Sequence, residues 1–254
     1  MSRTRILALL GVLVLWAVVS HGNRLLGVMP PALLPTPGEV GKVFLDMVRD
    51  GTLPRHVATS LARVGVGFGL AAVAALALGL LSALCVPIRL LVEPVVEFVR
   101  PIPPLAFLPM FLVWFGLGEA SKVAFIGYTT FFPMFVAITA SVLRVDMALL
   151  RAAASLGAGH LGLVRRVIVP AALPGIIVAL RLGFALALFV IVGAEFMGAD
   201  SGLGYLIMEG RTFFVPAQIV MGALVLGLLG SLVNALLVAT ERRLFRWRES
   251  GVTS

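Results

Sequence analysis

The chain has 254 residues, of which 60% are hydrophobic and 13% charged, and its formal net charge is +8. A soluble domain cannot cover that much apolar surface, so the composition excludes an ordinary globular protein and indicates an all-α integral membrane protein. The basic residues flank apolar runs and form no patch interleaved with aromatic residues. Membrane lipid is therefore an expected partner, and nucleic acid is not.

Six apolar runs approach the roughly 20 residues that a helix needs to cross a bilayer core. They lie at residues 6–20, 64–86, 102–117, 123–143, 173–199 and 217–239. The sequence therefore predicts a polytopic protein with about six transmembrane helices. The first run, which follows Arg3 and Arg5, also fits a cleaved secretory signal ending near Ser20. An uncleaved helix is favoured because it leaves an even number of spans.

The distribution of basic residues predicts the orientation. With the amino terminus inside, the expected inner segments hold twelve of the 20 lysines and arginines, and the outer segments hold six. This excess places both termini in the cytoplasm. The chain then divides into an amino-terminal helix with an outer loop at 1–52, a transmembrane core at 53–247 and a cytoplasmic tail at 248–254.

The outer loop is predicted to carry a short surface helix. Behind a proline-rich start, Val40, Val43, Phe44 and Met47 follow helical spacing, which favours an amphipathic helix lying on the outer surface. Gly51 is the expected stop.

The segment 87–104 has two readings. It holds Arg89, Glu93, Glu97 and Arg100 among apolar residues, and three prolines follow. One reading is a surface loop on the cytoplasmic side, and the other is a structural elbow that packs beneath a pore.

A third polar segment, residues 144–172, has no counterpart on the expected outer side. Asp146 is a good N-cap for a first helix, and the alanines at 152–154 favour helix while leaving little side-chain bulk. A second subunit has room to approach such a helix closely. Gly157 and Gly159 are expected to end it.

A second helix is predicted at 161–169. It carries Arg165 and Arg166, and Pro170 and Pro174 are expected to prevent it from running straight into the fifth span. From the spacing alone, the whole polar segment reads equally well as a plain helix-turn-helix connection at the membrane surface.

Several chemistries are absent from the sequence. A phosphate-binding loop needs Gly-Lys-Ser/Thr, and neither Lys42 nor Lys122 stands in that context. The three histidines lack metal-ligand spacing, and no Gly-x-Ser-x-Gly motif is present. We therefore expect no ATP hydrolysis, no catalytic residue, no metal site and no cofactor in this chain.

Arg181 and Glu195 are the ionisable residues expected inside a span, with Arg63 near a span end. The first two are 14 positions apart, or roughly 21 Å along a straight helix, so they cannot pair with each other. Both either reach the interface or bond to neighbouring helices, or else Glu195 lies at an outer gate. An ion-coupled secondary transporter remains an alternative, although it favours more intramembrane carboxylates than this. A membrane enzyme lacks a catalytic constellation.

Three stretches resemble a known family. Residues 151–153, Gly157 and 167–170 resemble the Glu-Ala-Ala…Gly…Ile-x-Leu-Pro signature of permease subunits in ABC-type importers. The alkanesulfonate, taurine and nitrate branch of that family is similar in two further places, at 100–109 with 114–118 and at 193–195 with 201–205. The resemblance covers roughly 53–247.

The resemblance implies a type I ABC importer permease fold with a cytoplasmic coupling helix, in a bacterial plasma membrane. It implies two copies of a separate ATPase, which bind ATP and Mg²⁺, and an extracytoplasmic solute-binding protein. A second permease copy, usually identical, completes the pathway, which imports solute by alternating access. The substrate would be a small organic or inorganic anion such as alkanesulfonate, taurine or nitrate, with a pyrimidine precursor of thiamine as the alternative.

Two sets of site residues follow. Those expected to couple to the ATPase are Arg151, Ala152, Ala153, Gly157, Arg165, Arg166 and Pro170. The candidates for the substrate pathway are Trp114, Phe115, Arg181, Phe189, Glu195 and Met197. The family signature usually begins with Glu where this chain has Arg151. The cognate ATPase is therefore expected to offer an acidic or neutral groove at that contact.

Overall fold

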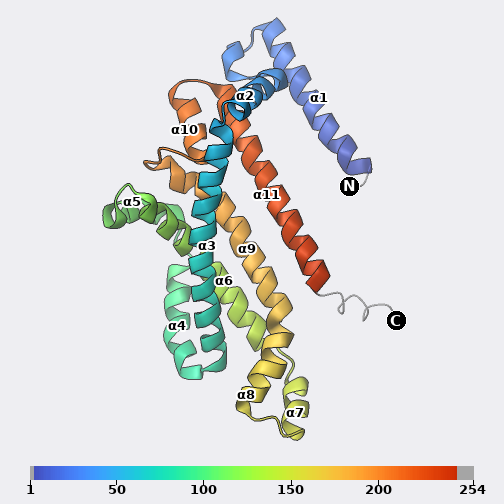
Figure 1. Cartoon of the computed structure of the whole chain (residues 1–254), viewed down its shortest axis with the longest axis vertical. Helices are drawn as coiled ribbons and strands as arrows, with labels where there is room; N and C mark the ends of the chain where they lie inside the picture. The colour runs from blue at the N-terminus through green and yellow to red at the C-terminus, as the bar shows by residue number, and fades with distance from the viewer. Residues whose placement is uncertain (1–2, 245–254) are drawn as a thin grey trace. The chain divides into compact units, whose positions relative to one another are not determined.

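A computed structural model describes residues 3–244, and all of its regular elements in that range are helical. The elements are α1 (Arg3–Leu26), η1 (Pro31–Leu33), α2 (Pro37–Arg49), α3 (Thr52–Leu84), α4 (Val86–Val99), α5 (Pro104–Phe115), α6 (Glu119–Leu143), α7 (Met147–Ser155), α8 (His160–Leu163), the π-helical turn η2 (Val164–Ile168), α9 (Val169–Phe196), α10 (Leu203–Thr212) and α11 (Pro216–Leu244) (Figure 1). The predicted all-α class is confirmed. The tail predicted at 248–254 lies outside the described residues.

Four helical stretches among the described residues are long and apolar enough to cross a bilayer. They are Thr52–Leu84, Glu119–Leu143, His160–Phe196 and Pro216–Ala239. The pair α4 and α5 passes the same test together and gives a fifth span, although it is bent by 101°. Of the six predicted spans, four coincide with these helices and 102–117 lies on one arm of the bent pair. The run 6–20 falls in α1. The apolar stretch of that helix, Leu10–Leu26, is shorter than the four candidate spans.

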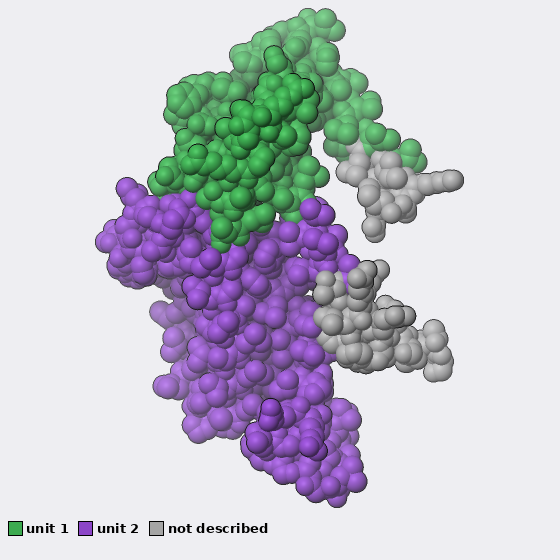
Figure 2. Space-filling model, viewed as in Figure 1, with its two compact units in different colours: residues 1–62, 195–229 green, residues 63–194, 230–254 purple. Residues whose placement is uncertain are grey.

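The chain forms two compact units, coloured separately in Figure 2. Unit 1 comprises Met1–Ala62 and Glu195–Leu229, and unit 2 comprises Arg63–Ala194 and Gly230–Ser254. Unit 1 has its own apolar core, formed by Val40, Leu53, Leu203, Leu206, Met221 and Val225. Because the buried Val40 comes from α2, this predicted amphipathic helix directs an apolar face into that core.

The boundaries of α2 follow from local chemistry. The Thr36 hydroxyl accepts a hydrogen bond from the Glu39 backbone N–H at 3.3 Å, and Glu39 Oε2 accepts one from the Thr36 backbone N–H at 2.8 Å. This reciprocal capping box satisfies two N–H groups that a helix start leaves without partners. Gly51, at a φ of +76°, follows the helix, so the predicted stop is confirmed.

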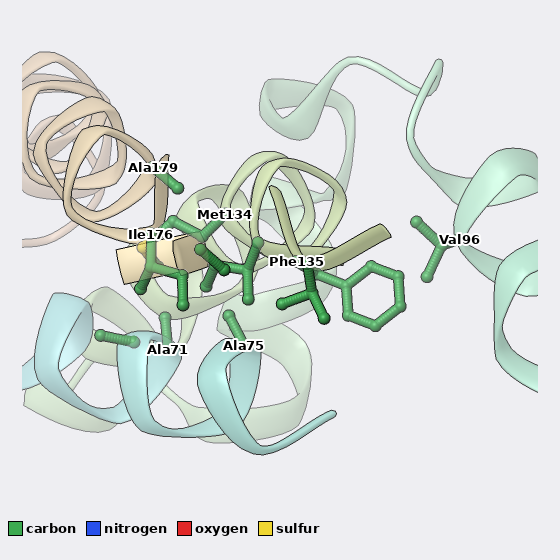
Figure 3. Close-up of a cluster of buried hydrophobic side chains, with 11 residues drawn as sticks. Ala71, Ala75, Val96, Met134, Phe135, Ile176 and Ala179 are labelled. Carbon is green, nitrogen blue, oxygen red and sulfur yellow. The ribbon is translucent and has the colours of Figure 1, made fainter. Parts of the chain in front are cut away.

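The core of unit 2 is built where α3, α6 and α9 meet. Its buried side chains include Ala71, Ala75, Met134, Phe135, Ile176 and Ala179 (Figure 3). Small residues on α3 and α9 bring the backbones near α6, which is how helices associate where lipid supplies no hydrophobic driving force. The fit is tight at Gly67, where an added Cβ would lie 2.8 Å from Ile126 Cβ.

The loop reading of 87–104 is wrong over most of its length. Residues 86–99 form α4. α3 ends at Leu84, and the extended backbone of the next residue, Cys85 (φ −120°, ψ 104°), reverses the chain. Pro94 lies inside α4 without ending it. The break comes only at Pro101 and Pro103, which lie in the turn between α4 and α5, and Pro104 then begins α5.

Candidate functional site

The polar segment 144–172 begins as the sequence predicts. Asp146 caps α7, because its Oδ1 accepts a hydrogen bond from the Ala148 backbone N–H at 2.8 Å. Gly157 follows the helix at a φ of +82°, in the left-handed region that favours glycine. The predicted cap and stop of this helix are confirmed, and α7 is a separate short rod at the end of unit 2 (Figure 1).

The polar segment exposes basic and apolar side chains together. Its exposed residues include Arg151, Ala152, Gly157, Arg165, Arg166 and Pro170, while Ala153 is half-buried. Exposed large apolar residues lie among them: Met147, Leu149, Leu156 and Leu161. Leu156 is 89% exposed. A run of exposed apolar residues rimmed by charge is typical of a protein–protein contact.

The proline break predicted within this segment is wrong. From His160 to Phe196 the chain is one helical span of 37 residues, with Pro170 and Pro174 inside it. The wider turn η2 comes just before Pro170, and in it the Val169 N–H donates to the Val164 carbonyl, five residues back. A π-helical turn gives the proline ring room against the preceding carbonyl, so the axis continues without a break.

Glu195 is a buried carboxylate with several donors. It is 1% exposed and accepts hydrogen bonds from the Ser60 hydroxyl and the Gly204 backbone N–H, each at 2.7 Å. Ser60 in turn accepts from the Leu203 N–H at 2.8 Å. These bonds tie the start of α10 to α3 within unit 1. They agree with the interpretation in which Glu195 bonds to a neighbouring helix.

The same turn is held from a second direction. His56 Nδ1 accepts a hydrogen bond from the Gly202 backbone N–H at 2.8 Å, so this nitrogen carries no proton in the structure. The imidazole stacks on the Tyr205 ring, with centroids 5.7 Å apart. Sequence reasoning missed His56 and Ser60, because 146 and 143 positions separate them from their partners in the turn. We call His56, Ser60, Glu195 and the turn 202–204 the acidic clasp.

Comparison with known proteins decides the family. Residues 52–246 match the family described as the binding-protein-dependent transport system inner membrane component. The chain belongs to this family.

Individual relatives agree with that assignment. The permease is 33% identical over 94% of its length, and 85% of the other chain, to the putative aliphatic sulfonates transport permease protein SsuC of Bacillus subtilis. It is 34% identical to the taurine transport system permease protein TauC of Escherichia coli, over 87% and 82% of the two chains. Among solved structures, the MetNI methionine ABC transporter shares the fold, with a TM-score of 0.67 at 21% identity over 76% and 95%.

Family membership fixes the general role of the permease. It is the transmembrane component of a binding-protein-dependent ABC importer and not a catalytic subunit. In ABC importers generally, ATP is bound by a separate ATPase and solute is delivered by a binding protein. The expectation of a multi-pass membrane protein is confirmed.

The structure places the predicted pathway residues on several elements. Trp114 and Phe115 end α5, and both rings contact Phe111, with centroid distances of 6.0 and 6.1 Å. Phe189 of α9 is 78% exposed, and no ring contact within the described residues joins it to this aromatic cluster. Arg181, half-buried on α9, has interactions within the chain.

The last two pathway candidates lie in unit 1. Glu195 belongs to the acidic clasp, and Met197 follows it in the turn after α9. The other four candidates belong to unit 2. Within the acidic clasp, Glu195 holds the start of α10 in place through its hydrogen bonds.

A charged cluster that sequence reasoning missed joins α3 to α6. Arg63 is 3% exposed, and its guanidinium donates to both oxygens of Glu119, at 2.6 Å each. Lys122 is also buried and donates to the Leu117 and Gly118 carbonyls at 3.0 and 3.2 Å. The turn between α5 and α6 is therefore fastened by cations from two helices. Because the Glu119 side chain is exposed, solvent screens this ion pair, and it stabilises the turn less than a fully buried pair would.

Proposed function

We propose that this permease imports a small organic anion of the alkanesulfonate or taurine type, with nitrate-like anions as the inorganic members of the class. The support is the similarity, at 33% and 34% identity, to permeases named for aliphatic sulfonates and for taurine. The substrate crosses by alternating access, and a separate ATPase supplies the energy for each cycle.

The observation that carries the mechanism is the exposed polar segment 144–172. Its apolar residues cannot be left in water without cost, and its arginines give it a positive rim. We propose that this segment is the coupling region and that it docks into a groove of the ATPase. The contact residues are Arg151, Ala152, Ala153, Gly157, Arg165, Arg166 and Pro170.

The assembly and orientation belong to the same proposal. Two copies of the permease form one pathway with two ATPase copies, and an extracytoplasmic binding protein delivers the solute. Both termini lie in the cytoplasm, on the side of the polar segment, with 1–52 forming the first helix and outer loop and 53–247 the core. Trp114, Phe115, Arg181, Phe189, Glu195 and Met197 remain the proposed pathway residues.

Reconstitution tests this function. The permease, its ATPase and its binding protein are placed in liposomes, and uptake of radiolabelled taurine, ethanesulfonate, nitrate and a thiamine-type pyrimidine is measured with and without ATP. Accumulation of a sulfonate that needs ATP and both partners is the expected result. Accumulation by the permease alone, driven by a proton or sodium gradient, would overturn the proposal.

The charge at position 151 tests the coupling contact. Arg151 is exposed on α7, and the family signature usually has Glu there. We expect Arg151→Glu to weaken assembly with the cognate ATPase at least tenfold, because an acidic groove repels a second carboxylate. Co-purification at graded salt measures this, with Arg49→Glu on α2 as the matched control. Unchanged assembly and uptake would show that position 151 does not select the ATPase.

A further inference from the structure

A hollow beside the polar segment carries a further inference. It lies between α4 and the carboxy-terminal half of α6, beside the end of α3, and has a volume of about 480 Å³. Its lining includes Val96 and Phe135, and Figure 3 shows the Phe135 ring reaching from α6 toward Val96 of α4. Leu143 lines it as well, so the hollow reaches the last residue before the polar segment.

A buried hydroxyl faces this hollow without a partner. Ser82 lines the hollow, is 0% exposed, and its Oγ has no hydrogen-bond partner in the structure. Leaving a buried hydroxyl unsatisfied typically costs about 1–3 kcal/mol. Because Ser82 has no accessible surface, a ligand in the hollow would supply the missing partner once the neighbouring side chains shift slightly.

Four charged side chains of both signs line the same hollow. Arg89, Glu93, Glu97 and Arg100 are spaced four, four and three positions apart on and just beyond α4, so they form one stripe. Each successive step rises roughly 4.5–6 Å along the helix axis. Within residues 3–244, none of the four makes a hydrogen bond or ion pair through its side chain.

The absence of internal pairing matters because the spacing permits it. Oppositely charged residues four apart on a helix can reach each other, and here they line the hollow unpaired, with Glu93, Glu97 and Arg100 also exposed. Ionisable groups in a membrane protein typically mark a substrate or ion path or bind a partner. The stripe sums to zero charge, with two cations and two anions.

We propose that this hollow binds a dipolar group, in which an ammonium and an oxyanion are joined by a short linker. A simple anion would meet Glu93 and Glu97, and a simple cation would meet Arg89 and Arg100, so each alone is opposed by like charge. A dipolar group satisfies both signs, and one of its oxygens can accept a hydrogen bond from Ser82.

Two sources supply this chemistry. One is a free solute such as an aminoalkanesulfonate or an amino acid, and this reading rests on the proposed function because it makes the hollow part of the import route. The other is the ethanolamine phosphate headgroup of a phospholipid. Exposed Leu90, Leu91, Val95 and Phe98 on α4 offer apolar surface for its chains.

Binding to the full-length permease distinguishes the sources. The chain is placed in phosphatidylglycerol nanodiscs, which offer no ammonium group, and equilibrium binding of radiolabelled taurine is measured. Ethanesulfonate, which lacks the amine, and ethylamine, which lacks the sulfonate, serve as competitors. Native mass spectrometry with added phosphatidylethanolamine tests the lipid source, because a retained lipid adds a defined mass.

We expect one dipolar probe to bind at least tenfold more tightly than either half-molecule. The variants Arg89→Gln/Arg100→Gln and Glu93→Gln/Glu97→Gln should each weaken its binding at least tenfold, and Ser82→Ala severalfold. Arg49→Gln, an exposed arginine on α2, is the control and should change nothing. Each variant is first checked by size-exclusion chromatography. A variant that fails to fold loses its monodisperse elution peak, so it is not mistaken for a folded variant that binds weakly.

Three results overturn the inference. They are equal binding of taurine and ethanesulfonate, insensitivity of binding to the glutamate pair, and failure of both taurine and phosphatidylethanolamine to bind. The proposed function is judged separately by ATP-driven uptake in the complete importer. Normal sulfonate uptake without any binding of a dipolar probe would contradict the proposed role of the hollow and leave the proposed import function standing. Binding of a dipolar probe without ATP-driven uptake would support the role of the hollow and contradict the import function.

Discussion

A side chain at position 202 has no room in the acidic clasp. Gly202 has a φ of +115°, and an added Cβ would collide with the Glu195 carboxylate. The carboxylate cannot move aside without giving up its bonds to Ser60 and the Gly204 N–H. The glycine and the glutamate therefore depend on each other, although six residues separate them in the sequence.

Gly202→Ala is expected to lower stability by about 2–4 kcal/mol, since backbone strain and the lost carboxylate bonds act together. Thermal unfolding in detergent, followed by circular dichroism, measures it. Gly65→Ala is the control, because Gly65 is helical and an added Cβ meets nothing within 4 Å. Equal melting of the two variants would show that the clasp contributes little to stability.

The pKa of Glu39 gives a residue-scale prediction with a defined direction. The Thr36 backbone N–H, and after it the Arg24 guanidinium, hold the pKa of Glu39 below its ordinary value of 4.5. A carboxyl with a lowered pKa stabilises the fold fully above its ordinary pKa, and that contribution is lost as the pH falls below it.

Glu39→Gln is therefore expected to melt at a lower temperature than the parent at pH 6, and the difference should shrink as the pH falls toward 3. Asp46→Asn, also on α2, controls for the loss of a charge from this helix. A melting difference that stays constant over this range would contradict the assignment of the capping box as the cause.

At the scale of the elements, local signals were predictable and long-range ones were not. Asp146 and Gly157 mark the ends of α7 through bonds and dihedral angles within a few residues of themselves, so the sequence was sufficient to place them. Arg63 pairs with a glutamate 56 positions away, and nothing in the local sequence reveals that contact. The helix break predicted at Pro170 was wrong because the π-helical turn that accommodates this proline has no sequence signature.

The α3–α6 contact provides an element-scale prediction. An added Cβ at Gly67 would lie 2.8 Å from Ile126 Cβ and 2.9 Å from the Val123 carbonyl oxygen, which is backbone and cannot give way. Gly67→Val is expected to cost about 1–3 kcal/mol or more through overpacking. Gly65→Val, two positions away with open space around its Cβ, is the matched control for the loss of a glycine. The two variants are compared by their melting temperatures in detergent.

At the scale of the whole molecule, composition and the polar segment predicted the fold class and the family role, because both depend on many residues. The number of spans was less well determined: α4 and α5 share one apolar stretch across a bend of 101° that hydropathy does not register. The charged hollow could not be foreseen, since α4 must fold back along α6 before its stripe faces anything.

The orientation of the whole chain can be tested with its natural single cysteine. Cys85 is exposed where α3 gives way to α4, so the proposed topology places it on the cytoplasmic side. A membrane-impermeant maleimide is expected to label inside-out vesicles and to leave intact cells unlabelled. Cys85→Ser provides the background signal. Labelling of intact cells would require the opposite orientation.

The uninterrupted helix from His160 to Phe196 would let the proposed coupling region act as a lever. Its 37 residues extend roughly 55 Å, and only the short connection 156–159 separates its near end from α7. A tilt of about 5° imposed at that end displaces a point at the far end by roughly 5 Å, which approaches one helical turn. Mechanical work done by a motor on one side of a bilayer would thus be felt on the other with no flexible joint in between.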